Sequence, residues 1–154
     1  MAHRLQYMAS TLPEGATRDL LRSFKVCAGC DQFNRLGEAH DGGYLTCMDG
    51  LSNGHLKAAY SMGVKDHDKW SDDIYNLLKI PVHQFDCTVD GPANPCPDCH
   101  FYQACLMAPD GKGAVEGKTG WTLEEALRQS GQKYARERSL IMKMDIEGAE
   151  WPVL

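Results

Sequence analysis

Three carboxylates stand close together near the end of the printed sequence and could do chemistry. Asp145, Glu147 and Glu150 follow the apolar run over residues 139–144. A short apolar run is typical of a buried strand, and open α/β sheets bind ligands at the carboxyl ends of their strands. Asp145 comes first after the run, where a partly buried carboxylate needs a partner. We therefore take these carboxylates, Asp145 above all, as candidate groups of a ligand site, with a solvated acidic turn as the alternative.

A second group of residues has the spacing of a nucleotide-binding site. Residues 56–64 predict an apolar strand with Ser61 and Gly63 at its end. Residues 81–86 predict a second strand that ends in Asp86. Small residues let a ligand approach the backbone, and a carboxylate about 20 residues further on can accept hydrogen bonds from ribose hydroxyls. Because a full G-x-G-x-x-G motif is missing, a tight turn and a strand-end cap fit the same residues.

Helices and a hairpin must position these strands. Thr122 and Glu125 form a capping box at the start of a helix over residues 122–131. Ser71 is expected to cap a helix over residues 70–78. The remaining elements that we expect are a helix over 16–24, a hairpin over 34–50 with its turn at 41–43, and a short strand or helix around 101–107. Strands that alternate with helices in this way predict an α/β fold.

The composition fits a single globular domain. The chain has 154 residues, of which 43% are hydrophobic and 24% charged, and we divide it into an N-terminal helical extension (1–33) and a main domain (34–154). A net charge of −5 argues against a nucleic-acid partner. No apolar run approaches the roughly 20 residues of a membrane helix. Residues 1–12 lack the features of a signal peptide, so we expect a cytoplasmic protein. A targeting segment further upstream would place it in the secretory lumen instead.

The chain contains 7 cysteines, four of which form two C-x-x-C pairs. Cys27 with Cys30 and Cys96 with Cys99 could supply the four thiolates of a zinc site, which makes a small zinc-stabilised domain one alternative. Disulfides or reduced thiols are the simpler use of these residues. The C-x-x-C-H string over residues 96–100 also fits covalent haem attachment, but nothing else in the chain indicates a cytochrome.

Several segments together resemble a known protein family. Residues 143–151 (KMDIEGAEW) look like the signature of the FkbM-like and METTL-like methyltransferase families. The similarity covers about residues 34–154 and keeps the order of the motifs along the chain. The further segments that carry it are 35–37 with 41–44, 59–64, 85–89 and 122–123.

The resemblance implies S-adenosylmethionine as the cofactor, on a Rossmann-like class I methyltransferase sheet. By that resemblance Ser61 and Gly63 lie against the methionine portion, and Asp86 holds the ribose. Asp73 occupies the place of an acid near the start of the first helix. The resemblance makes Asp145 and Glu147 the candidate catalytic residues, which would hold a metal or orient a substrate hydroxyl. Asp145 faces the reacting end of the pocket and would be the base for O-methyl transfer to a small-molecule or glycan-type acceptor.

The resemblance also implies strands beyond the one over residues 139–144. A sheet of this family has three more strands after its fourth, so we expect the sheet of this chain to be C-terminally incomplete. The rival interpretation that follows is a non-catalytic remnant or interaction module.

An incomplete sheet predicts self-association. The strand over residues 139–144 would expose one edge, and the unpaired backbone N–H and C=O groups of an edge favour pairing with another chain. We expect light scattering on the purified protein to give a mass above that of the monomer. A monomer with a sharp cooperative melt would contradict this expectation.

Overall fold

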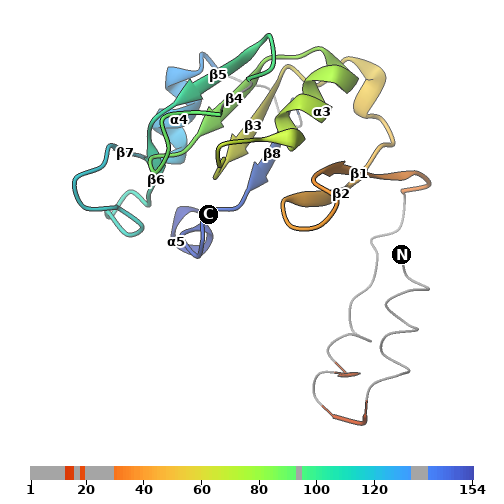
Figure 1. Ribbon diagram of the computed structural model, residues 1–154, viewed down its shortest axis with the longest axis horizontal. Helices are drawn as coiled ribbons and strands as arrows, with labels where there is room; N and C mark the ends of the chain where they lie inside the picture. Colours follow the sequence, from red (N-terminus) through yellow and green to blue (C-terminus); the bar gives the residue numbers. More distant parts are fainter. Residues whose placement is uncertain (1–12, 16–17, 20–29, 93–94, 133–138) are drawn as a thin grey trace. The chain divides into compact units, whose positions relative to one another are not determined.

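The computed structural model describes residues 13–15, 18–19, 30–92, 95–132 and 139–154 (Figure 1). The chain divides into two compact units, Met1–Asp31 and Gln32–Leu154. Most of the helix predicted over residues 16–24 lies outside the described residues, and so does Cys27. The second unit carries all the elements discussed below.

Four parallel strands form the centre of this unit (Figure 1). They are β3 (Ala58–Met62), β4 (Val82–Phe85), β5 (Cys99–Tyr102) and β8 (Leu140–Met144), in the order β5-β4-β3-β8. Each neighbouring pair is parallel. All five residues of β3 are buried, as expected of a parallel strand covered on both faces. The predicted α/β class and the strands predicted from three apolar runs are confirmed.

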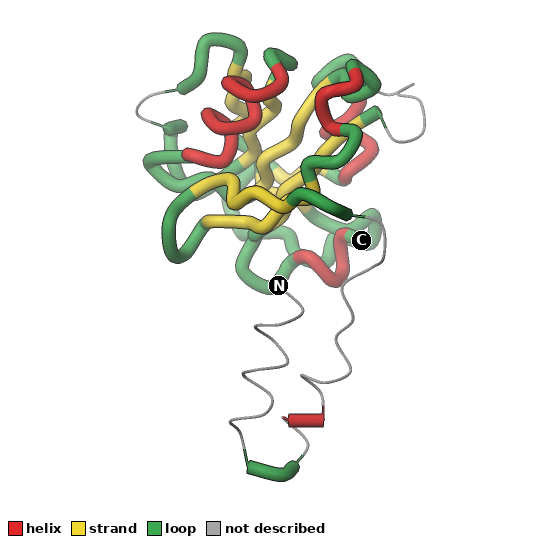
Figure 2. The backbone as a smooth tube through the Cα atoms, turned by 90° about the vertical axis from the view of Figure 1, so that its right-hand side faces the viewer, coloured by secondary structure: helices red, strands yellow, loops and turns green. Residues whose placement is uncertain are grey.

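Helices cover the two faces of the sheet (Figures 1 and 2). Side chains alternate between the faces along a strand, so neighbouring β3 residues enter different cores. Ala59 packs in a cluster with Ile74 of α3 (Lys69–Leu78). Tyr60 packs in a second cluster with Ala126 of α4 (Leu123–Gln129). The sheet is thus the middle layer between α3 and α4.

The helix caps agree with the sequence at α4 but not at α3. The Thr122 side chain accepts a hydrogen bond from the backbone N–H of Glu125, and the Glu125 carboxylate accepts one from that of Thr122, so the predicted capping box is confirmed. The prediction that Ser71 caps α3 is wrong. Asp68 is the N-cap, and its carboxylate accepts hydrogen bonds from the backbone N–H and the hydroxyl of Ser71. Ser71 lies inside the first turn, where its own N–H needs a cap.

The remaining elements pack around this centre. The predicted hairpin is confirmed as antiparallel β1 (Phe33–Gly37) and β2 (Gly43–Cys47). The segment predicted around residues 101–107 is the end of β5 followed by β6 (Cys105–Leu106), which pairs with β7 (Gly120–Trp121). The described residues of this unit also form two short helices, η1 (Leu51–Asn53) and α5 (Glu150–Val153).

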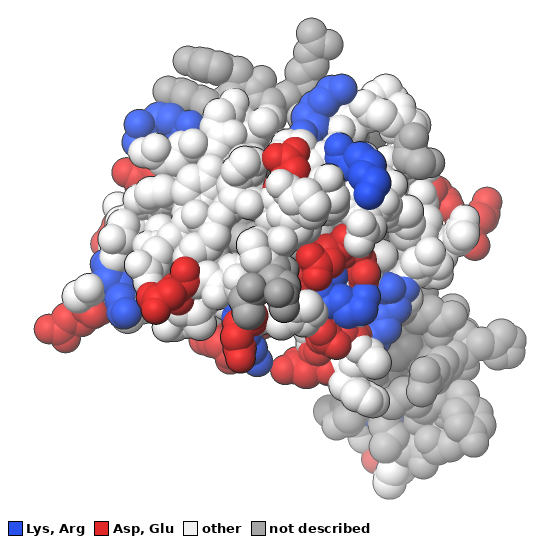
Figure 3. Space-filling model, turned by 45° about the horizontal axis from the view of Figure 1, so that its top comes forward, with Lys and Arg blue, Asp and Glu red and all other residues white. Residues whose placement is uncertain are grey.

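Charged side chains of both signs are mixed on the face seen in Figure 3, without a continuous basic patch among the described residues there. This distribution fits the acidic net charge of the whole chain. None of the described helices is long and apolar enough to cross a membrane.

His83 of β4 is a buried titratable group next to Tyr60, a member of the cluster that contains Ala126 of α4. Its side chain is 5% exposed and its ring lies 5.2 Å from that of Tyr60 and 5.4 Å from that of His100, centre to centre. Its Nδ1 lies 3.3 Å from the Tyr102 hydroxyl. Burial, and then repulsion from His100, lower the pKa of His83 to about 4. His83 is therefore neutral in the folded protein at neutral pH.

We predict that stability falls as the pH is lowered from about 6.5 to about 4. In this window the unfolded chain takes up a proton on His83 at the ordinary pKa, whereas the folded chain does not. The loss should reach about 3 kcal/mol, because one pKa unit corresponds to about 1.4 kcal/mol. Urea unfolding at each pH measures it. His83→Gln should flatten the slope, and exposed His55→Gln should keep it. Equal slopes for all three proteins would contradict the prediction.

Candidate functional site

The carboxyl ends of β3 and β8 meet where the strand order changes direction. From β3 the chain continues to β4 on one side, and it later returns as β8 on the other side. The backbone N–H of Asp145 donates to the carbonyl of Met62 at 2.9 Å, and that of Gly63 donates to the carbonyl of Phe85 at 2.9 Å. Such a crevice outside the strand ends is the usual ligand site of an open α/β sheet.

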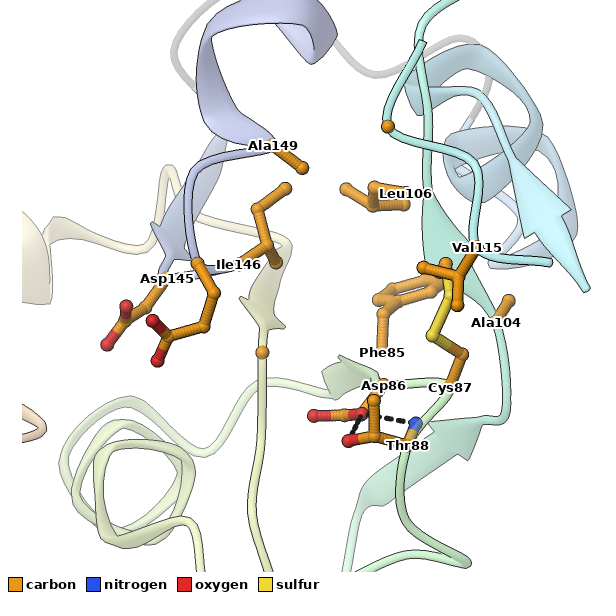
Figure 4. Close-up of a pocket in the computed structure, with 14 residues that line it drawn as sticks. Phe85, Asp86, Cys87, Thr88, Ala104, Leu106, Val115, Asp145, Ile146 and Ala149 are labelled. Carbon is orange, nitrogen blue, oxygen red and sulfur yellow. Dashed lines mark hydrogen bonds between the residues drawn. A yellow bond between two sulfur atoms is a disulfide. The ribbon is translucent and has the colours of Figure 1, made fainter. Parts of the chain in front are cut away.

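A cavity of about 350 Å³ opens beside this point (Figure 4). The volume is within the range of small-molecule sites. Side chains of Leu106, Val115 and Ile146 give it apolar walls. Its carboxylates are those of Asp86, Asp145 and Glu147. The cavity thus combines apolar walls with a few polar groups, as small-molecule sites do.

A smaller cavity of about 90 Å³ also borders Gly63 and Asp145. Charged groups of both signs line it. The cations are Lys65, Lys69 and Lys143, and the acids are Glu38, Asp41, Asp68 and Asp145. Gly63 and Asp145 line both cavities, so the end of β3 borders each of the two spaces.

Gly63 is required by the close approach of the two strand ends. Its φ is 79°, in the left-handed region. A Cβ built on it would lie 1.7 Å from the carbonyl oxygen of Asp145. The backbone contact with Asp145 therefore excludes a side chain at this position, whether or not a ligand binds beside it.

Asp145 is held in place by Tyr44 of β2. The Tyr44 hydroxyl donates to Oδ2 of Asp145 at 2.6 Å. Burial, and then this hydrogen bond, raise the pKa of the Tyr44 phenol, so it stays protonated and donates. The ammonium of Lys143 lies 5.7 Å from the centre of the Tyr44 ring and donates to the carbonyl of Gly63. Asp145 lies at a strand end, as predicted, but its partner Tyr44 was not predicted.

Asp86 is fixed by a turn of its own. Its Oδ1 accepts hydrogen bonds from the backbone N–H of Thr88 at 2.7 Å and from the Thr88 hydroxyl at 2.6 Å. Figure 4 shows both contacts at the border of the larger cavity. The carboxylate is therefore held at one oxygen while the group borders an open space.

The carboxylates of Glu147 and Glu150, in the loop after β8, differ in their contacts. Glu147 is exposed, has a φ of 58° and lines the larger cavity. Glu150 instead accepts hydrogen bonds from the N–H groups of Ile146 and Gly148, at 2.7 and 2.8 Å. The backbone N–H groups of Glu150 itself and of Ile146 lower the pKa of this carboxyl. Glu150 thus shapes the loop that carries Glu147.

Two of the predicted cofactor-binding residues lie away from the cavities. Ser61 is fully buried within β3, lines neither cavity, and its Oγ has no hydrogen-bond partner among the described residues. Asp73 also lines neither cavity. It accepts hydrogen bonds from the Gly37 backbone at 2.8 Å and from Lys69 at 2.6 Å, and so ties the hairpin to α3. The structure therefore brings Gly63, Asp86, Asp145 and Glu147 together and leaves Ser61 and Asp73 outside.

Two disulfides lie within the second unit. Cys87 is bonded to Cys105, and Cys96 to Cys99, with Cα–Cα distances of 4.8 and 5.0 Å. A zinc site built on the two C-x-x-C pairs needs the thiolates of Cys96 and Cys99, and the disulfide uses both of them. Cys96 and Cys99 therefore form a disulfide, and neither is a zinc ligand or a reduced thiol in this structure.

No protein-family model, curated protein or solved structure matches the chain. Any function is therefore inferred from the two cavities and the groups that line them.

The contact between Gly63 and Asp145 predicts a strong effect of a single methyl group. Gly63→Ala should lower the free energy of unfolding by about 2–5 kcal/mol, because overpacking adds to the cost of a left-handed residue with a side chain. Gly54→Ala is the matched control, since its φ is 76° and a Cβ there would meet nothing within 4 Å. It should cost only about 1 kcal/mol. Urea denaturation measures both, and equal losses would contradict the prediction.

Proposed function

We propose that the chain is an S-adenosylmethionine-dependent methyltransferase-like domain with a Rossmann-like class I sheet. One observation carries the proposal: Gly63 and Asp86, at the ends of the first two sheet strands, border one cavity. The strand order supports it, because third-second-first-fourth is the first part of the doubly wound order. Dinucleotide sites occupy this place in such sheets.

The two cavities match the two ends of the cofactor in chemical character. S-adenosylmethionine joins an uncharged adenosine to a zwitterionic amino acid. The larger cavity, with the apolar side chains of Leu106, Val115 and Ile146, suits the adenine ring. The smaller cavity, with lysines and acids together, suits an ammonium and a carboxylate. The sulfonium would then lie near Gly63 and Asp145, which border both spaces.

Asp86 is the proposed ribose ligand. Its Oδ1 is occupied by Thr88, which leaves Oδ2 to accept from the ribose hydroxyls. Hydrogen bonds to a charged acceptor are worth about 1.5–3 kcal/mol each. The fixed turn reduces the side-chain entropy lost on binding.

Asp145 is the proposed base, and Glu147 a second acid at the same cavity. Methyl transfer from a sulfonium depends mainly on placing the acceptor in line with the methyl group. A hydroxyl acceptor must also lose a proton, which a carboxylate within hydrogen-bond reach can take. Tyr44 holds Oδ2 of Asp145, so Oδ1 is the oxygen available for that proton. The acceptor class that we propose is a small molecule or a glycan that carries a hydroxyl.

The disulfides bear on the compartment of the protein. Disulfides persist in oxidising compartments and are rare in the cytosol. We therefore favour the secretory lumen over the cytoplasm, on the strength of the two bonds in the second unit.

Self-association is proposed for the outer edge of the sheet. Within the described part of the chain, β8 pairs with β3 alone, so the other edge of β8 is available to pair with a second copy.

Binding of S-adenosylhomocysteine, measured by calorimetry, tests the proposed function. We expect wild type to bind and Asp86→Ala to bind at least about tenfold more weakly, because a lost charged hydrogen bond costs about 1.5–3 kcal/mol. Asp90→Ala is the matched control, an exposed acid on the same loop that does not line the cavity. Absence of wild-type binding at millimolar ligand would refute the proposal and favour the non-catalytic alternative. Equal affinities of wild type and Asp86→Ala would refute the role of Asp86.

A further inference from the structure

The Cys87–Cys105 disulfide forms part of the wall of the larger cavity. Both residues line the cavity, and they are 6% and 7% exposed. The bond joins the loop after β4 to β6 across a sequence separation of 18 residues. Figure 4 shows Cys87 beside Asp86 on the same loop. This cysteine pair is therefore part of the candidate site.

Cys87 lies between the two residues that form the turn of Asp86. Asp86 and Thr88 are joined by two hydrogen bonds across it. A covalent bond at the middle residue of this turn limits the movement of the turn as a whole. The bond from Cys87 to Cys105 therefore helps to fix the position of the Asp86 carboxylate at the cavity.

Cys105 is a fixed point for this bond. Its backbone N–H donates to the carbonyl of Thr119 at 2.8 Å, and it pairs with Gly120 in the β6–β7 ladder. The next residue, Leu106, belongs to the same core cluster as Tyr60 and Ala126 and is 3% exposed. The disulfide thus ties the Asp86 turn to a strand that the core already holds.

Other described contacts of the loop are weaker. The backbone N–H of Asp86 donates to the carbonyl of Tyr102 at a long 3.3 Å. Beyond the turn, the exposed Gln103 amide donates to the carbonyl of Val89 at 3.1 Å and to the carboxylate of Asp90 at 3.0 Å. Exposed hydrogen bonds add little net stability, because water competes for both groups. Among the described contacts, the disulfide is the covalent restraint that ties the turn to another element.

We propose that the Cys87–Cys105 disulfide is a positioning element that sets the affinity of the larger cavity for an adenosine-containing ligand. The claim rests on the proposed function and adds a covalent determinant of it. When the bond is absent, the turn samples positions in which Asp86 no longer faces the ribose. The apparent affinity is then the intrinsic affinity multiplied by the fraction of molecules that keep the binding geometry.

A dithiol such as dithiothreitol opens the bond. One thiolate of the reagent attacks a cysteine sulfur, the protein S–S bond breaks, and a mixed disulfide forms. The second thiol of the reagent resolves it and leaves as a cyclic disulfide. Two electrons pass to the protein, and both cysteines end as protonated thiols.

The second disulfide provides a matched control. Cys96–Cys99 lies at the start of β5, where Cys99 pairs with Val82 at the beginning of β4. It is therefore at the opposite end of the strands from the cavities and lines neither of them. Loss of this bond removes a cross-link without touching the Asp86 turn.

The test compares two double variants with the oxidised wild type. Calorimetry measures the affinity for S-adenosylhomocysteine, and thermal melts measure stability. Cys87→Ser with Cys105→Ser should bind at least about tenfold more weakly, as expected if no more than about a tenth of the molecules keep the geometry. Cys96→Ser with Cys99→Ser should lower the melting temperature but keep the affinity within about twofold. Equal affinity of the first variant and wild type would overturn the proposal.

Two further measurements keep the outcomes separate. If the first variant does not fold, stepwise reduction of wild type with mass mapping of alkylated cysteines replaces it. Affinity must then fall as Cys87–Cys105 opens, and a fall that follows Cys96–Cys99 instead overturns the proposal. If wild type binds no ligand, the proposed function fails. Amide exchange of residues 86–88 then decides the positioning claim, which requires faster exchange only when the Cys87–Cys105 bond is missing.

Discussion

The parallel pairing of β3 with β8 is the constraint on which the site depends. It places the N–H of Asp145 on the carbonyl of Met62 and brings the carbonyl of Asp145 against Gly63, where no side chain fits. Because both strands are parallel and β4 lies on the other side of β3, their carboxyl ends open at the same edge of the sheet. Gly63 and Asp145 line both cavities for this reason.

Around this edge, three restraints of different kinds fix the groups that face the cavities. The phenol of Tyr44 holds Asp145 from the hairpin, a tight turn holds Asp86 at one oxygen, and the loop after β8 is closed by the carboxylate of Glu150. The disulfide adds a covalent restraint at Cys87. Fixed polar groups beside an apolar wall reduce the entropy that a ligand must remove on binding.

Much of the fold was predictable from the sequence because its signals are local. Apolar runs marked three sheet strands, and the box of Thr122 with Glu125 marked α4. The positions of Gly63, Asp86 and Asp145 at strand ends followed from those runs. The rest depended on contacts between distant residues. Tyr44 is 101 positions from Asp145, and Asp73 reaches back 36 positions to Gly37. The cap of α3 was misassigned because Asp68 and Ser71 both have capping side chains, and only the backbone decides between them.

We propose that an adenosine-containing cofactor occupies the larger cavity between the ends of β3, β4 and β8. The most direct measurement is a titration of isotope-labelled protein with S-adenosylhomocysteine, followed through backbone amide chemical shifts. We expect the largest changes at Gly63, at Asp86 to Thr88 and at Leu106, and no change at His100 at the other end of the strands. Changes confined to residues outside the cavity, or no saturable change at millimolar ligand, would contradict it.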